Sequence, residues 1–317
     1  MRRLAIAAAA ALSLACLWDT DTLQEESLKQ RDTLEVVTGK LRHHATAWYE
    51  AKIAYTRPLI DKGTAKQERY DDLAVALAKT GDVDGALAVM ADKEARFPGQ
   101  YTTEANIGTF YAMKGDGAKA TEHLEKAIAI NPDAHFGREK YQLQLLDYMA
   151  RVDKDPSLVK SEDFLKLPID RDIMMALSPS KAEMKDRPTV PKDAVTAIVG
   201  LIRFGGNDQN MHLWFSLGLA LGWQGHKNLA LRALRRADLL GHPLAAQVGG
   251  WIAVADRPVM AIRDRRPDDG RELLEQAWAV AVEQADADWA RGDRWEQARE
   301  AAEVALAKKH PRKAFGY

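Results

Sequence analysis

The chain has very little cysteine and almost no net charge. Cys16 is the only cysteine among 317 residues, so an intramolecular disulfide is impossible and a cysteine-rich zinc site is excluded. The 45 Lys and Arg residues are balanced by 46 Asp and Glu residues, which leaves no general attraction to the nucleic-acid backbone. We therefore expect no nucleic-acid partner and no cysteine-held metal.

The sequence also lacks the common motifs of catalysis and phosphate binding. It contains no Gly-x-Ser-x-Gly elbow, no His-Glu-x-x-His and no glycine-rich loop that ends in Lys-Ser or Lys-Thr. His43 and His44 are adjacent, so on a helix they point in different directions, and we interpret them as surface side chains. We expect a protein that is not an enzyme and that binds no cofactor and no metal.

Strand signals are scarce and alanine is abundant, which predicts an all-α protein. Residues 70–134 repeat themselves at an offset of 34 residues, and a fixed period of this size indicates a helical repeat protein. The matched pairs are Leu73 and Ile107, Ala74 and Gly108, Leu77 and Tyr111, Gly81 and Gly115, Ala86 and Ala120, Met90 and Leu124, and Pro98 and Pro132.

Each unit reads as two short amphipathic helices. Tyr70, Leu73 and Leu77 share one helical face in the first unit. Gly81 makes the turn, because glycine tolerates the left-handed conformation that ends a helix, and Pro98 stops the second helix. Small residues at the matched inner positions let the two helix backbones approach closely.

The second unit resembles a tetratricopeptide repeat (TPR). The residues that carry the resemblance are Gly108, Tyr111, Gly115, Ala120, Leu124, Ala127 and Pro132. A third copy is similar, with Trp214, Leu217, Gly218, Leu221, Gly225, Ala230, Leu234 and Ala237. The resemblance implies a solenoid of TPR-like helical hairpins that binds a peptide or protein segment in its concave groove.

In such a solenoid the first helices line the concave side, so residues opposite the packed seam should face the groove. These candidate peptide-binding residues are Asp71, Val75, Ala78, Ala105, Thr109, Ala112, Phe215, Leu219, Gly222 and Trp223. Asp71 and Val75 depart from the lysine and asparagine that the carboxylate clamp of some family members needs. Phe215 and Trp223 are the expected anchors, since exposed aromatic side chains favour recognition. The alternative is that residues 151–192 cover both aromatic side chains.

Residues 1–15 read as a secretory signal peptide. Arg2 and Arg3 precede an apolar run that is shorter than the roughly 20 residues needed to span a bilayer. Residues 12–16, Leu-Ser-Leu-Ala-Cys, resemble a bacterial lipobox. The resemblance implies that the chain is cut before Cys16, that the Cys16 thiol carries a diacylglycerol, and that the protein is an outer-membrane lipoprotein facing the periplasm. An ordinary signal peptide cut after Ala15 is the alternative.

The remaining pattern divides the chain into segments. Residues 16–60 are expected to form a tether and N-terminal capping helices, 61–150 TPR-like repeats, 151–192 a proline-rich irregular insertion or linker, 193–255 a further TPR-like repeat region, and 256–317 a charged loop and a C-terminal helical hairpin. Ala47, Ala51 and Ala54 are expected on one face of a capping helix, with Trp48 beside them. The tail from His310 to Tyr317 is expected to fray.

These features favour a non-enzymatic protein–protein interaction scaffold, exported and lipid-anchored in the bacterial cell envelope. Its partner would be a protein or peptide segment held in the groove, and no oligomeric state is inferred. The alternative hypothesis is an extracytoplasmic solute-binding module in which residues 151–192 close over a peptide or glycan.

Overall fold

The protein is all-α. The computed structural model describes residues 33–167, 169, 189–205, 207–254 and 267–315. These residues form 13 α-helices and two short 3-10 helices, and they contain no strand. In chain order the elements are α2 (Thr33–Val37), α3 (Thr46–Asp61), α4 (Gln67–Lys79), α5 (Val83–Arg96), α6 (Tyr101–Met113), α7 (Gly117–Ile130), η1 (Ala134–Gly137), α8 (Arg138–Lys154), η2 (Pro156–Lys160), α10 (Ala194–Gly205), α11 (Met211–Trp223), α12 (Lys227–Leu239), α13 (Ala245–Val254), α15 (Pro267–Lys309) and α16 (Pro311–Phe315).

Three helical hairpins share one turn geometry. They are α4/α5, α6/α7 and α11/α12, and in each a glycine with a positive φ ends the first helix: Gly81 (94°), Gly115 (77°) and Gly225 (85°). The backbone N–H of the next residue donates to a carbonyl five positions earlier in all three, at distances of 2.9, 2.9 and 2.8 Å. Only glycine adopts this φ without strain, so the glycine fixes where each hairpin turns.

Close packing inside two of the hairpins also depends on glycine. A Cβ atom at Gly108 would lie 2.8 Å from Cγ of Leu124, and one at Gly218 would lie 2.6 Å from Cγ of Leu234. Both leucines are fully buried. The first helix of each hairpin therefore lies directly against the leucine of the second helix.

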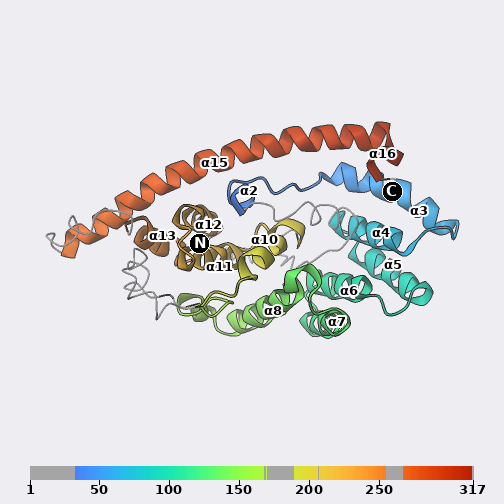
Figure 1. Cartoon of the computed structure of the whole chain (residues 1–317), viewed down its shortest axis with the longest axis horizontal. Helices are drawn as coiled ribbons and strands as arrows, with labels where there is room; N and C mark the ends of the chain where they lie inside the picture. The colour runs from blue at the N-terminus through green and yellow to red at the C-terminus, as the bar shows by residue number, and fades with distance from the viewer. Residues whose placement is uncertain (1–32, 168, 170–188, 206, 255–266, 316–317) are drawn as a thin grey trace, which may run out of the picture.

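One long helix follows the repeats along the edge of the molecule (Figure 1). The C-terminal hairpin expected from the sequence is wrong, because α15 continues from Pro267 to Lys309 as 43 residues of helix. Gly292, which lies between the two halves of the expected hairpin, is an interior position of this helix. A Cβ atom there would overlap the carbonyl oxygen of Thr38, so the glycine serves close contact with the end of α2. The part of the expected charged loop up to residue 266 lies outside the described residues.

The C-terminal end of the described chain packs on α3. The buried residues of α3 are Trp48, Lys52, Thr56 and Ile60, and Ala51 is partly buried beside Trp48. The tail is not frayed, because residues 311–315 form α16 and the Phe315 ring is fully buried. Phe315 meets Trp48 edge-on, with 5.2 Å between the ring centroids.

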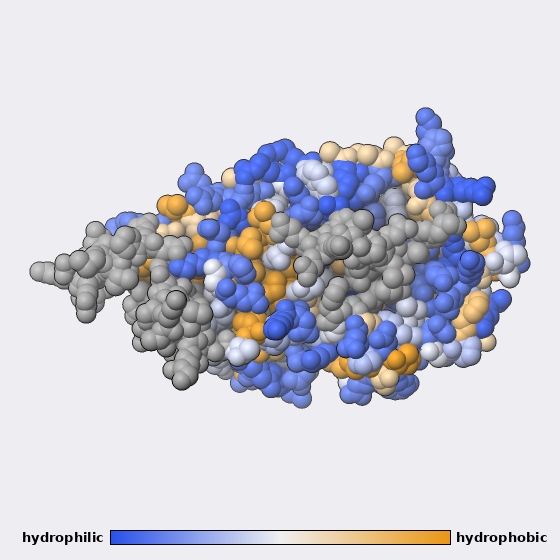
Figure 2. All heavy atoms as spheres, viewed as in Figure 1, coloured by the Kyte–Doolittle hydropathy of each residue, from blue (hydrophilic) through white to orange (hydrophobic). Residues whose placement is uncertain are grey.

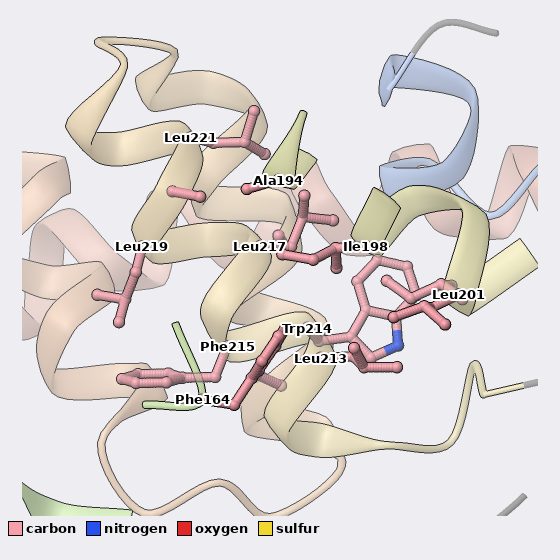
Figure 3. Close-up of a cluster of buried hydrophobic side chains, with 14 of the residues drawn as sticks. Phe164, Ala194, Ile198, Leu201, Leu213, Trp214, Phe215, Leu217, Leu219 and Leu221 are labelled. Carbon is pink, nitrogen blue, oxygen red and sulfur yellow. The ribbon is translucent and has the colours of Figure 1, made fainter. Parts of the chain in front are cut away.

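The beginning of the proline-rich segment is packed onto the core. After η2, the Phe164 side chain is buried in the main hydrophobic cluster together with residues of α8, α10 and α11. Figure 3 shows Phe164 next to Phe215 of α11. Residues 168 and 170–188 of this segment lie outside the described residues. Among the residues that the structure describes, no helix combines the length and the apolar character needed to cross a membrane.

Candidate functional site

The residues expected to line an open groove are buried. The exposed fractions are 4% for Asp71, 3% for Val75, 0% for Ala105, 0% for Thr109, 1% for Phe215, 0% for Leu219 and 4% for Trp223. Ala78 and Ala112 are each 3% exposed and Gly222 is buried. The prediction that these side chains face a partner directly is therefore wrong for the structure as it stands.

The physical reason is that first helices pack on first helices along this face. The Asn106 amide of α6 donates to the Asp71 carboxylate of α4 at 3.1 Å, and the Gln142 amide of α8 donates to the Thr109 hydroxyl at 3.4 Å. Both contacts join residues about one repeat apart. The helix face that was predicted to line the groove therefore packs against the next unit.

Buried charged side chains join helices α4, α5 and α6. The ammonium group of Lys93 donates to both carboxylate oxygens of Asp71 at 2.7 Å and to the Thr102 hydroxyl at 2.6 Å. Burial raises the pKa of Asp71 to about 6, although Lys93 acts in the opposite direction. A second buried pair, Lys52 and Asp72, lies beside it with 3.1 Å between nitrogen and oxygen. These groups hold helices together and do not face solvent.

The Phe215 side chain is buried and is not exposed as an anchor for a partner. Its ring stacks on His242, with 3.8 Å between the centroids and 13° between the planes. Phe164 belongs to the same buried cluster and is drawn near Phe215 in Figure 3. The alternative raised from the sequence, that residues 151–192 cover this aromatic side chain, therefore fits Phe215. Trp223 is buried within the same hydrophobic cluster.

A buried polar cluster surrounds that aromatic contact. It consists of Asp163, His212, Ser216 and His242, each no more than 4% exposed. Burial lowers the pKa of His212 to about 4 and that of His242 to about 3, with the neighbouring His212 contributing to the second shift. Burial raises the pKa of Asp163 to about 6, while the Ser216 hydroxyl and the Leu167 backbone N–H oppose that rise. Both imidazoles are therefore neutral near pH 7.

This cluster does not assemble a nucleophile. A reactive serine needs a base within hydrogen-bonding distance and an open approach for substrate. His212 precedes Ser216 by one helical turn, yet no hydrogen bond joins the Ser216 hydroxyl to either histidine. Within the described ranges, no group of three or more His, Cys, Asp or Glu side chains is placed to hold a metal ion.

The sequence reasoning missed several buried polar residues. Lys93 falls three positions after Met90 and seven after Ala86, on the inward face of α5, which is an unusual place for a lysine and could have been noticed. His43 is not a free surface side chain, because its Nε2 lies 3.0 Å from the Arg203 carbonyl oxygen. His44 stacks on Trp48 with 3.7 Å between ring centroids. The surface interpretation of both histidines was wrong.

The apolar side chains that a partner can reach are few and scattered. Within the described part, the large hydrophobic side chains with substantial exposure are Leu34 (45%), Ile130 (47%), Leu239 (53%), Val280 (52%) and Leu306 (37%). The face seen in Figure 2 is mostly hydrophilic, with hydrophobic residues in separate groups. Ile130 and Leu239 each lie at the end of the second helix of a hairpin. Cys16, the expected lipidation site, lies outside the described residues.

Comparison with known proteins identifies no relative. No family model matches the chain, and a search of curated proteins finds no match either.

Proposed function

We propose that this chain is a non-enzymatic protein-interaction scaffold of the bacterial cell envelope, built as a TPR-like solenoid and anchored to a membrane through Cys16. One observation carries the proposal. Three hairpins, two of them consecutive and the third after residue 210, use the same glycine turn with the same backbone hydrogen bond. Units of one design, stacked on one another, form the extended surfaces that repeat proteins use to bind other proteins.

The stacking supports a rigid body rather than a set of separate hairpins. Hydrogen bonds between side chains of α4 and α6 and of α6 and α8 join neighbouring units. Because the predicted groove face lies in these seams, the partner binds to the outer surface of the scaffold. The exposed side chains of Ile130 and Leu239 replace Phe215 and Trp223 as the apolar contacts to be tested.

Affinity purification from detergent-solubilised envelope tests the scaffold proposal. The wild-type chain should retain one protein in fixed stoichiometry, and Ile130→Glu or Leu239→Glu should weaken its retention. Ala129→Glu is the matched control for Ile130→Glu, since it places the same charge on an adjacent exposed position of α7. Retention of no protein in fixed stoichiometry would refute the proposal.

The membrane anchor requires a separate test. Its support is the apolar leader followed by Cys16, the only cysteine of the chain. Protein from the native host should enter the detergent phase in a phase-separation experiment, whereas Cys16→Ser should stay in the aqueous phase. Identical behaviour of the two proteins would exclude a lipid on this thiol.

A second candidate function, binding of a peptide or glycan solute, has one observation in its favour. Nδ1 of His212 and Nε1 of Trp223 are buried on α11 without a hydrogen-bond partner. A bound polar ligand would satisfy such atoms after a local opening of residues 161–167. A small molecule that stays with the purified chain, and is lost from His212→Phe, would favour this function over the scaffold.

A further inference from the structure

A dense group of basic side chains occupies one end of the molecule. Residues 308–313, at the end of α15 and the start of α16, read Lys-Lys-His-Pro-Arg-Lys, and all of them are exposed. α16 rests on α3, where the Phe315 ring contacts Trp48. We define the basic corner as the exposed cationic residues of these two neighbouring regions: Arg57, Lys62, Lys66, Lys308, Lys309, Arg312 and Lys313.

The basic corner is unusual for a chain with a net charge of −1. The acidic side chains that α3 exposes there are Glu50 and Asp61. In Figure 2, hydrophilic residues project from the end of the molecule where Figure 1 places α16. The opposite charges that balance the whole chain therefore lie elsewhere on the protein.

The cations of the basic corner also lack ion-pair partners. None of the seven makes an ion pair with any residue that the structure describes. Several cations elsewhere are paired one helical turn away, as in Arg96 with Asp92 (2.9 Å), Lys126 with Glu122 (2.7 Å) and Arg151 with Asp147 (3.1 Å). Other exposed cations of the described chain without an ion pair, such as Lys154 and Lys192, are not gathered in a group of this size. Like charges gathered without partners repel one another, so they favour binding to a surface that carries many negative charges.

The chain length between Cys16 and Thr33 limits how far the proposed anchor can lie from the described structure. The end of α2 lies against α15 at Gly292, and about 24 Å of helix separates Gly292 from Lys308 at 1.5 Å per residue. Cys16 precedes the first described residue by 17 positions, which permits a span of up to about 56 Å. A lipid on Cys16 and the basic corner can therefore meet the same membrane surface.

We propose that the basic corner docks on an anionic phospholipid surface and holds the body of the protein against the membrane. The orientation of the protein on the membrane rests on the proposed Cys16 anchor. Binding of the basic corner to anionic lipid does not depend on that anchor. A lipid chain and a group of basic residues together bind a membrane more stably than either does alone. Docking at this end would leave the outer helices α5, α7 and α12 available to a protein partner.

Vesicle flotation of the full chain carrying Cys16→Ser tests the basic corner without any lipid anchor. We expect this protein to float with vesicles of equimolar phosphatidylglycerol and phosphatidylcholine, to stay behind with phosphatidylcholine alone, and to dissociate as salt is added. Replacing Lys308, Lys309, Arg312 and Lys313 by Gln should weaken binding at least tenfold, because each basic residue near such a surface contributes about fivefold.

The matched control replaces Lys114, Lys119, Lys126 and Lys140 by Gln, which removes the same charge from exposed positions on α7, α8 and the turn before α7. Its binding should stay within a factor of two of the parent. Circular dichroism should show that both variants keep their helix content, since all eight positions are exposed. Equal binding to neutral and anionic vesicles, equal losses in both variants, or tighter binding to double-stranded DNA than to anionic vesicles would overturn the proposal. The detergent-phase result for Cys16→Ser reports on the anchor independently of these outcomes.

Discussion

At the scale of single residues, Gly108 and Gly218 mark the points where two helix backbones come closest. Alanine is the better helix former by about 1 kcal/mol, so a glycine kept inside a helix needs a packing reason. Here the reason is the buried leucine on the facing helix.

Gly108→Ala should destabilise the protein by about 1–3 kcal/mol, because the new methyl group overlaps Leu124 in a filled core. Gly117→Ala is the control, since a Cβ atom there meets nothing within 4 Å, and it should be neutral or stabilising by up to about 1 kcal/mol. Urea unfolding of both variants measures the difference. Equal stabilisation by both changes would show that Gly108 is not packed as described.

The pair of Asp71 and Lys93 gives a second prediction. Lys93→Met keeps the volume of the side chain but leaves the Asp71 carboxylate buried without its cation, which should cost about 3–5 kcal/mol. Asp71→Asn combined with Lys93→Met should recover most of that loss, because the amide can still bond to neighbouring side chains. Thermal unfolding of the single and double variants checks this. A single variant as stable as the wild type would contradict the buried pair.

The two buried histidines predict a loss of stability in acid. Burial holds the pKa of His242 in the folded protein at about 3, below the ordinary value of 6.5. The unfolded chain therefore takes up the proton first as the pH falls below 6.5, and stability falls by up to about 1.4 kcal/mol per pH unit for this group. Asp163, whose folded pKa of about 6 lies above its ordinary 3.8, acts in the opposite direction between those values.

His242→Phe should remove this contribution, since a phenyl ring can stack on Phe215 but does not titrate. The free energy of unfolding of the variant should fall less steeply than that of the wild type between pH 6.5 and 4, while Asp163 affects both proteins alike. Exposed His226→Gln is the control and should keep the wild-type slope. Parallel slopes for wild type and His242→Phe would mean that His242 is not buried in its neutral form.

At the scale of secondary-structure elements, helix α15 shows where sequence reasoning failed. A glycine between two apolar helical patterns reads as a turn when the chain is considered alone. In the structure Gly292 lies inside a continuous helix because the backbone of α2 passes against it. Repeat hairpins could be predicted because their turns and inner faces depend on residues close in sequence. The contact between α2 and α15 joins segments about 250 residues apart, which no local pattern reveals.

Gly292→Ala distinguishes these two interpretations. At a flexible turn or in an unobstructed helix, alanine would be neutral or would stabilise the protein by up to about 1 kcal/mol. In the packing described, the added methyl group displaces α2, so we expect destabilisation and faster hydrogen exchange in residues 33–39. Unchanged exchange in α2 together with increased stability would contradict the contact.

At the scale of the whole molecule, α15 connects the first helices of the described chain to the last ones before it. It contacts α3 near one end and α12 and α13 near the other (Figure 1). Arg232 and Arg235 of α12 donate to Asp288 and Asp286 of α15 at 2.7 and 2.8 Å. The sequence predicted separate repeat regions but not this connection. When each unit was considered by itself, the inner faces of the first helices looked like an open groove.

The candidate site was the part that sequence could predict least. Helical spacing correctly grouped Asp71 with Val75 and Phe215 with Leu219 on shared faces, but it could not say what covers those faces. The covering groups include helix α6 for Asp71 and the His242 ring for Phe215. Exposure depends on the complete assembly of helices, which the period of the repeat does not determine.

The most direct test of the scaffold account is a native mass spectrum of the protein purified in mild detergent from its own envelope. The account predicts a complex of this chain with a protein partner in fixed stoichiometry. In the same spectrum, the chain should lack residues 1–15 and should carry acyl groups on Cys16. Detection of the chain without a protein partner and with an unmodified Cys16 thiol, or with only a small ligand bound, would contradict the account.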